Sequence, residues 1–297
     1  MSTRRPFAGT WTAIVTPFRD GKLDEAAFQK LVQLQVRGGV DGIVPVGTTG
    51  ESPTLDYDEH IRVVELAVKA ADGRIGVMAG TGGNSTREAV YLTLEAAKAG
   101  ADASLQVAPY YNKPTQDGLF QHFAEIAAAT RLPLMLYSIP GRCGVEIAVE
   151  TAARLAAACP TVVGIKEAGG NADRVSQLRA ALPANFTVLS GDDALTLPFM
   201  AVGADGVVSV ASNVAPKPVA ALVRKFTAGD LRGALKLHQQ LYPLFKDLFL
   251  ETNPAPVKAA LAELGLIADE LRLPLCPMTA KARAALVATL KATGVLK

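Results

Sequence analysis

The sequence is poor in the residues that hold metals and form disulfides. It contains three cysteines and three histidines in 297 residues: Cys143, Cys159, Cys276, His60, His122 and His238. The cysteines are widely spaced, odd in number and lack a CxxC pair, which argues against a zinc site and for reduced thiols in a cytoplasmic protein. The histidines form no cluster in the sequence, so we expect no metal site.

Strong net charge and long apolar runs are also missing. Thirty Lys and Arg residues nearly balance 28 Asp and Glu residues, so nucleic acid and anionic membranes are not expected partners. Glycine, proline or charge interrupts every apolar stretch before it could span a bilayer. Residues 1–7 lack the apolar run of a signal peptide, which again favours the cytoplasm. Dinucleotide and Walker loops are absent, so we expect no cofactor.

Eight short apolar runs alternate with longer amphipathic stretches. The expected strands are 11–16, 42–46, 75–79, 103–108, 134–138, 162–166, 187–190 and 206–210. The expected helices between and after them are 24–38, 56–71, 85–99, 116–129, 149–158, 172–181, 195–202 and 217–226. This rhythm of βα units predicts an α/β fold, a (β/α)8 TIM barrel, over residues 1–229. An open doubly wound sheet is the alternative, but its GxGxxG turn is missing.

Residues 230–297 lack strand patterns and are expected to form an all-helical C-terminal domain. One helix is expected over 230–250, with a kink at Pro243. Asn253 followed by Pro254 is typical of a helix start, leading to a helix that ends at Gly265. A last helix is expected from Thr279 to about residue 292.

Lys166 is the residue most at odds with its surroundings. It ends the β-branched run 162–166, where a charge is costly unless something uses it. Burial favours a neutral amine, and a neutral amine attacks a carbonyl to form a Schiff base. The alternative is a structural lysine whose ammonium reaches the rim of the barrel.

Other polar side chains follow the ends of neighbouring strands, the side of a barrel that holds its active site. Tyr137 lies one strand from Lys166 and is the natural proton-transfer partner, with Thr48 as a bridge to Tyr111. Two anion sites are expected, one at Thr49 in a glycine-rich turn and one at Arg142. Taken alone, each of these residues could serve only the fold. Thr48 and Thr49 suit a tight turn, and Arg142 can pair with Glu146 or Glu167.

With these motifs in place, the chain resembles the dihydrodipicolinate synthase and N-acetylneuraminate lyase superfamily of class I aldolase-type lyases. The resemblance runs from about Phe7 to the C-terminal helices. The motifs that carry it are Gly47-Thr48-Thr49-Gly50-Glu51-Ser52, Ala108-Pro109-Tyr110-Tyr111-Asn112-Lys113-Pro114, Leu136-Tyr137-Ser138-Ile139-Pro140-Gly141-Arg142, Gly164-Ile165-Lys166-Glu167-Ala168 and Ser190-Gly191-Asp192-Asp193.

The resemblance implies that Lys166 binds pyruvate as a Schiff base, whose enamine attacks L-aspartate 4-semialdehyde on the diaminopimelate route to lysine. It implies a proton relay of Tyr137, Thr48 and Tyr111, with Tyr111 entering from a neighbouring subunit of a homotetramer built as a dimer of dimers. The substrate-binding positions that it implies are Thr49 for the pyruvate carboxylate, Arg142 for the aldehyde carboxylate, and Gly191 and Val208 along the pyruvate site.

The sequence departs from the family pattern at two places. Ser138 stands where asparagine is usual. The positions that match the allosteric lysine site of lysine-sensitive members are Ser52, His60, Asn84, Glu88 and Tyr110. Tyr57 stands where some members have histidine, and Pro53 where small residues are common. Whether L-lysine inhibits is therefore left open, because Asn84 and Glu88 can also cap the helix at Ser85.

Two other functions stay open. A sister lyase acting on N-acetylneuraminate or a 2-keto-3-deoxy acid would use the same imine on Lys166. Such sisters usually carry serine in place of Thr48, so Thr48, Arg142 and the Tyr110-Tyr111 pair favour the synthase. A non-catalytic barrel that binds a keto acid is disfavoured by the complete set of catalytic side chains.

Overall fold

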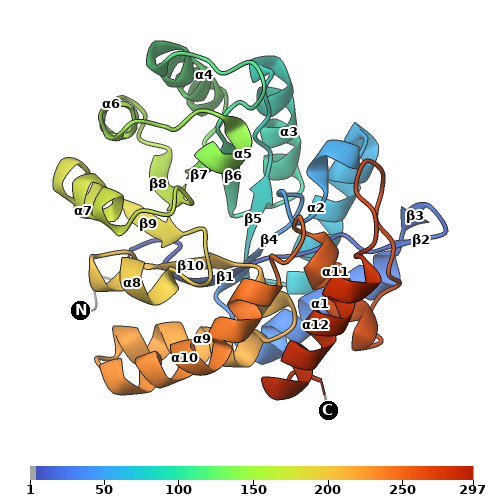
Figure 1. Ribbon diagram of the computed structural model, residues 1–297. Helices are drawn as coiled ribbons and strands as arrows, with labels where there is room; N and C mark the ends of the chain where they lie inside the picture. The colour runs from blue at the N-terminus through green and yellow to red at the C-terminus, as the bar shows by residue number, and fades with distance from the viewer. Residues whose placement is uncertain (1–4, 297) are drawn as a thin grey trace.

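The computed structural model describes residues 5–296, in which eight parallel strands form a closed barrel (Figure 1). Around the barrel the strand order is β1-β10-β9-β8-β7-β6-β5-β4. The strands are β1 (Gly9–Ala13), β4 (Gly42–Val44), β5 (Gly76–Gly80), β6 (Ala103–Val107), β7 (Leu134–Ser138), β8 (Val162–Glu167), β9 (Thr187–Ser190) and β10 (Gly206–Ser209). Each strand pairs with its neighbour in the chain, and β1 closes the ring against β10. The predicted (β/α)8 barrel is confirmed.

Helices occupy the intervals between the strands and ring the barrel (Figure 1). They are α1 (Glu25–Gly38), α2 (Tyr57–Ala71), α3 (Thr86–Lys98), α4 (Gln116–Ala129), α6 (Val149–Ala158), α7 (Ala172–Ala181), α8 (Thr196–Ala201) and α9 (Pro216–Thr227). The side chains of Asp24 and Asp56 cap α1 and α2 by accepting hydrogen bonds from the backbone N–H groups of Ala27 and Glu59. The N-cap residue of α3 is Ser85, whose side chain makes no capping hydrogen bond.

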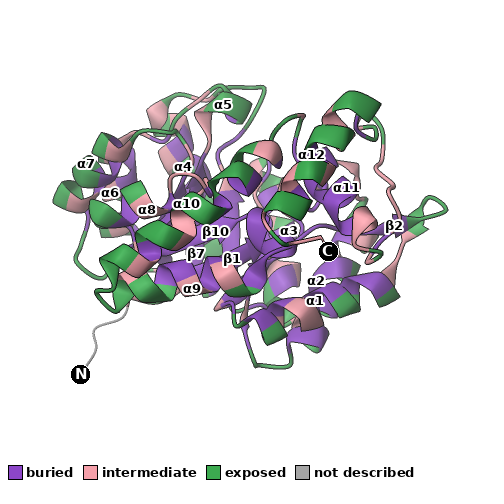
Figure 2. Ribbon diagram, turned by 60° about the horizontal axis from the view of Figure 1, so that its bottom comes forward, coloured by how far each residue is buried: buried purple, intermediate pink, exposed green. Residues whose placement is uncertain are grey.

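The buried apolar side chains form two layers, one inside the barrel and one between the strands and the helices. Figure 2 shows the strands as largely buried and the surrounding helices with both buried and exposed residues. Trp11 is the largest side chain of the inner layer. A Cβ atom at Gly42 would lie 2.2 Å from its ring, and one at Gly76 would lie 2.5 Å away. Glycine is therefore required at the first residue of β4 and of β5 for the indole to fit.

Three further helices follow the barrel: α10 (Leu231–Asp247), α11 (Ala255–Glu263) and α12 (Ala280–Ala292). Helix α10 packs on α9, and α11 contacts the 3-10 turn η2 (Ala211–Asn213) after β10. The helix expected over 230–250 runs through Pro243. The predicted helix start at Asn253 is wrong, because Pro254 holds the N-cap position of α11. A domain boundary at residues 229 and 230 stays a prediction.

Several short elements of the structure were not predicted. They are the hairpin β2 (Phe18–Arg19) and β3 (Lys22–Leu23), the 3-10 turn η1 (Ser52–Thr54) and the helix α5 (Pro140–Cys143). Among residues 5–296, none of the helices has the length and apolar character needed to cross a membrane.

Candidate active site

Lys166 lies near the carboxyl end of β8 with 6% of its surface exposed. Its strand neighbours are Tyr137 on β7 and Leu189 on β9. The Nζ atom is 3.9 Å from the centroid of the Tyr137 ring. Burial lowers the pKa of the amine to about 7, Arg142 acts in the same direction and Asp193 opposes it. A large fraction of this amine is therefore neutral at neutral pH, unlike a surface lysine.

Asp193 is a buried carboxylate beyond the end of β9, and the sequence did not single it out for the site. It accepts hydrogen bonds from Ser209 Oγ at 2.5 Å and from the backbone N–H groups of Val210 and Ala211 at 2.9 Å. Burial raises its pKa to about 6, while these hydrogen bonds lower it. Its position two residues after Gly191 is the signal in the sequence that places it near the lysine.

Tyr137 and Thr48 form the next part of the site. The phenol of Tyr137 is buried, which raises its pKa, whereas Arg142 and a hydrogen bond with Thr48 lower it. Thr48 lies in the turn after β4, which closes through Gly50 N–H donating to Gly47 O at 3.0 Å. The structure thus brings together Lys166, Tyr137 and Thr48.

Tyr111 does not join this group within its own chain. It follows β6 in a left-handed conformation, with φ of 72°, and 92% of its surface is exposed. Left-handed backbone is uncommon outside glycine, asparagine and aspartate. An exposed aromatic ring on a loop of this shape is available to another molecule rather than to Lys166 of the same chain.

A pocket of about 200 Å³ opens at the carboxyl ends of β4 to β7. Its lining residues are mostly apolar, with Thr48, Tyr137 and Arg142 as the main polar contributors: Val46, Gly47, Thr48, Ser52, Pro53, Gly80, Gly82, Leu105, Val107, Tyr110, Tyr137, Ile139, Arg142 and Cys143. Its volume is below the range of drug-sized pockets. The pocket therefore suits a small substrate.

The two expected carboxylate sites are joined by a single residue. Asn253 donates from Nδ2 to Thr49 Oγ1 at 3.0 Å. Its backbone oxygen accepts a hydrogen bond from Arg142 Nη2 at 3.3 Å. Thr49 is buried, whereas Arg142 is exposed on α5. Sequence reasoning missed Asn253, because it follows no strand of the barrel.

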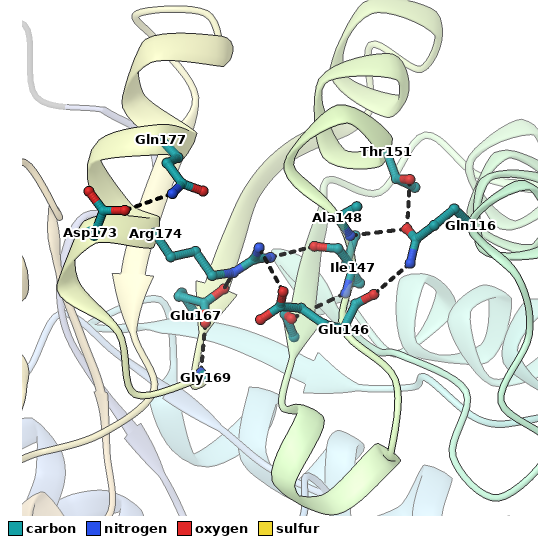
Figure 3. A network of polar contacts seen from close by, with 11 residues as sticks. Gln116, Glu146, Ile147, Ala148, Thr151, Glu167, Gly169, Asp173, Arg174 and Gln177 are labelled. Carbon is teal, nitrogen blue, oxygen red and sulfur yellow. Dashed lines mark hydrogen bonds and ion pairs between the residues drawn. The ribbon is translucent and has the colours of Figure 1, made fainter.

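The carboxylates considered as alternative partners of Arg142 belong to another network (Figure 3). Arg174 on α7 pairs with Glu167 at 2.7 Å and with Glu146 at 3.1 Å. It also donates to Ile147 O. Glu167 thus points out of the barrel interior, as strand alternation predicts. The network fixes the segment that follows α5 and leaves Arg142 unpaired by these two acids.

Ser138, where the family usually has asparagine, lies at the end of β7 and is fully buried. Its Oγ accepts a hydrogen bond from Ile147 N–H at 3.3 Å. The hydroxyl thus satisfies a backbone donor of the same segment, which gives the serine a structural role beside Tyr137.

Gly191 and Val208 border the lysine from the other side. A Cβ atom at Gly191 would lie 3.1 Å from Lys166 Cε and 2.6 Å from the Ala168 Cβ atom. Glycine therefore keeps space open beside the amine. Val208 on β10 is buried in the inner apolar layer.

Of the five residues matched to the allosteric lysine site, Ser52, Asn84 and Glu88 lie near Tyr110. Asn84 donates from Nδ2 to Tyr110 O at 3.2 Å. Burial and the nearby Glu88 carboxylate raise the pKa of Tyr110. Ser52 lines the pocket together with Tyr110. His60 is buried and hydrogen-bonds the Gly80 backbone, and burial lowers its pKa to about 4.

Residues 5–296 contain no cluster of three or more His, Cys, Asp or Glu side chains arranged to hold a metal ion.

The closed barrel, with Lys166, Tyr137 and Thr48 together at the carboxyl ends of its strands, defines the class of this protein as a (β/α)8-barrel with a candidate active site at that face. Within this class the chain belongs to the Dihydrodipicolinate synthetase family, whose model matches residues 6–293.

Three relatives document the match. The chain is 51% identical to the 4-hydroxy-tetrahydrodipicolinate synthase of Thermodesulfovibrio yellowstonii, over 98% of this chain and 100% of the relative. The structure of the 4-hydroxy-tetrahydrodipicolinate synthase from Methylacidiphilum fumariolicum SolV superposes with a TM-score of 0.96 at 58% identity, covering 97% and 96% of the two chains. The structure of a chloride-inhibited dihydrodipicolinate synthase from Acinetobacter baumannii, complexed with pyruvate, superposes with a TM-score of 0.95 at 46% identity. The match covers 97% of this chain and 99% of that chain.

Proposed function

We propose that the protein condenses pyruvate with L-aspartate 4-semialdehyde to give 4-hydroxy-tetrahydrodipicolinate, on the diaminopimelate route to lysine. The observation that carries the proposal is the buried Lys166 amine, whose pKa is lowered to about 7 beside the Tyr137 phenol. The pyruvate complex of the Acinetobacter baumannii relative supports pyruvate as the keto acid.

The proposed chemistry starts with attack of the neutral Lys166 amine on C2 of pyruvate. Tyr137, hydrogen-bonded to Thr48, returns protons to the carbinolamine oxygen, which leaves as water and gives the imine. Loss of a C3 proton gives the enamine, and its C3 attacks the aldehyde carbon. The amino group of the semialdehyde then attacks C2, closes the ring and releases the lysine amine.

The two carboxylates have separate proposed sites. Thr49 and the amides of its turn bind the carboxylate of pyruvate beside Gly191 and Val208. The exposed guanidinium of Arg142 binds the carboxylate of the aldehyde substrate, where a bidentate contact gives orientation. The Asn253 backbone oxygen, which accepts a hydrogen bond from Arg142 Nη2, helps to orient that guanidinium.

The proposed assembly is a homotetramer, a dimer of dimers, in the cytoplasm. Tyr111 supports it, because a phenol that is 92% exposed on its own chain can complete the relay of a neighbouring subunit. The proposed domain division keeps the barrel at residues 1–229 and the helical domain at 230–297.

We also propose a regulatory lysine site at Ser52, His60, Asn84, Glu88 and Tyr110. The Glu88 carboxylate beside Tyr110 supplies a partner for an ammonium group. Steady-state rates measured with millimolar L-lysine test this site. A rate that stays flat removes it.

The substrate is tested by comparing turnover of pyruvate with L-aspartate 4-semialdehyde against cleavage of N-acetylneuraminate and 2-keto-3-deoxygluconate. We expect turnover with the semialdehyde to exceed both cleavage reactions by at least about a hundredfold. Faster cleavage of either sugar acid would assign the imine chemistry to a sister lyase.

A further inference from the structure

We propose that Asn253 is a positioning residue that directs the Thr49 hydroxyl toward the carboxylate of the keto acid. This inference rests on the proposed function, which makes Thr49 a substrate-binding residue. Asn253 lies between α10 and α11, 204 positions from Thr49 in the sequence. Its side chain reaches Thr49 and its backbone oxygen reaches Arg142. One residue outside the barrel thus contacts both carboxylate sites.

The direction of the hydrogen bond carries the argument. A threonine hydroxyl has one hydrogen to donate and accepts with its lone pairs. Because Nδ2 of Asn253 donates to Thr49 Oγ1 at 3.0 Å, the hydroxyl hydrogen must point to another acceptor. Thr49 is only 4% exposed, so solvent is a poor competitor. The hydroxyl is thereby prepared to donate to a carboxylate oxygen beside it.

The remaining contacts of Asn253 argue against a purely structural role. Its side chain does not cap α11, whose N-cap residue is Pro254. Its Oδ1 atom is buried and, among residues 5–296, has no hydrogen-bond partner. A buried acceptor without a hydrogen-bond partner destabilises a protein. The protein thus leaves Oδ1 unpaired while Nδ2 donates to Thr49, which fits a role of Asn253 in the site.

Two substitutions at Asn253 change its side-chain contact with Thr49 and keep its backbone contact with Arg142. Asn253→Ala removes the amide and keeps the carbonyl that accepts from Arg142. We expect the pyruvate concentration for half-maximal borohydride trapping to rise about 3- to 10-fold, the effect of one hydrogen bond. The KM for the aldehyde and kcat should each stay within about twofold. Asn253→Asp is nearly isosteric but offers only acceptors, so it should turn the hydroxyl away and raise that concentration further, by about tenfold or more.

A double-mutant cycle with Thr49→Val tests whether Asn253 acts through the hydroxyl. In the Thr49→Val background, Asn253→Ala should cause no further rise. Additive effects, or equal rises for both substrates, would mean a general structural role and overturn the inference. Should the alanine variant fail to fold in thermal unfolding, the aspartate variant and its cycle decide the question. Wild-type protein that forms no trapped adduct would instead contradict the proposed function.

Discussion

Replacing Lys258 by methionine should destabilise the protein far more than replacing an exposed lysine. Lys258 on α11 and Glu51, which ends the turn of Thr48 and Thr49, are both completely buried and lie 2.5 Å apart. The methionine would leave the Glu51 carboxylate buried with a backbone N–H of Arg272 at 3.0 Å as its remaining partner. Breaking such a buried ion pair costs about 3–5 kcal/mol.

That loss converts into a measurable shift of the unfolding midpoint. At about 2.1 cal/mol/K of unfolding entropy per residue, a chain of 297 residues should lose about 5–8 °C in Tm. Thermal unfolding at one fixed protein concentration measures this shift, because association of subunits in the proposed tetramer would also change Tm. Lys98→Met is the matched control. Its lysine is exposed and pairs with Glu95 on the surface, so we expect no measurable loss of Tm.

A second variant separates two effects of Lys258→Met: the loss of the ion pair and the burial of an unpaired Glu51 carboxylate. Adding Glu51→Gln to Lys258→Met removes the carboxylate, and we expect at least half of the lost stability to return. A Lys258→Met protein as stable as the Lys98→Met control would refute the reasoning. So would a double variant that is less stable than Lys258→Met alone.

Further predictions concern the relay, the amine and the assembly. Tyr137→Phe should lower kcat/KM by about 10²- to 10⁴-fold. Tyr242→Phe, at an exposed position on α10, should leave kcat/KM unchanged. Near-normal turnover of the Tyr137→Phe variant would mean that the relay is misassigned. Because the pKa of Lys166 lies at about 7, the borohydride-trapping rate should rise with pH and level off above about 8. Asp193 raises this pKa, so Asp193→Asn should move the midpoint of the pH profile to lower pH. An unmoved midpoint would mean that the Asp193 carboxylate does not act on the amine. In mixtures of Tyr111→Phe and Lys166→Ala subunits, activity should exceed that of either variant alone, since one site regains both side chains; unchanged activity after mixing would contradict a shared site.

The parts of the fold that follow local rules could be predicted from the sequence. The strand Leu134–Ser138 and the helix Gln116–Ala129 were predicted at their observed ends. Their apolar runs are bounded by polar or proline residues, and the Thr115 side chain caps the helix. The barrel then follows from the repeated βα unit. Strand alternation likewise predicts that Glu167 points away from Lys166.

Contacts between distant segments could not be predicted in this way. Asn253 before proline is typical of a helix start, and nothing local indicates that its amide binds Thr49 across 204 positions. Lys258 lies on a helix where a lysine usually faces solvent, yet it is fully buried against Glu51. Thr49 and Glu51 thus find their partners in the C-terminal segment, whose sequence pattern indicates only helix packing.

The central claim is that Lys166 forms a Schiff base with pyruvate. Incubation with pyruvate and borohydride, followed by peptide mass analysis, tests it most directly. We expect one reduced pyruvate on the peptide that contains Lys166 and none on the peptide that contains Lys258, which is also buried but is paired with Glu51. An unmodified Lys166 peptide, or a label on another lysine, would contradict the account.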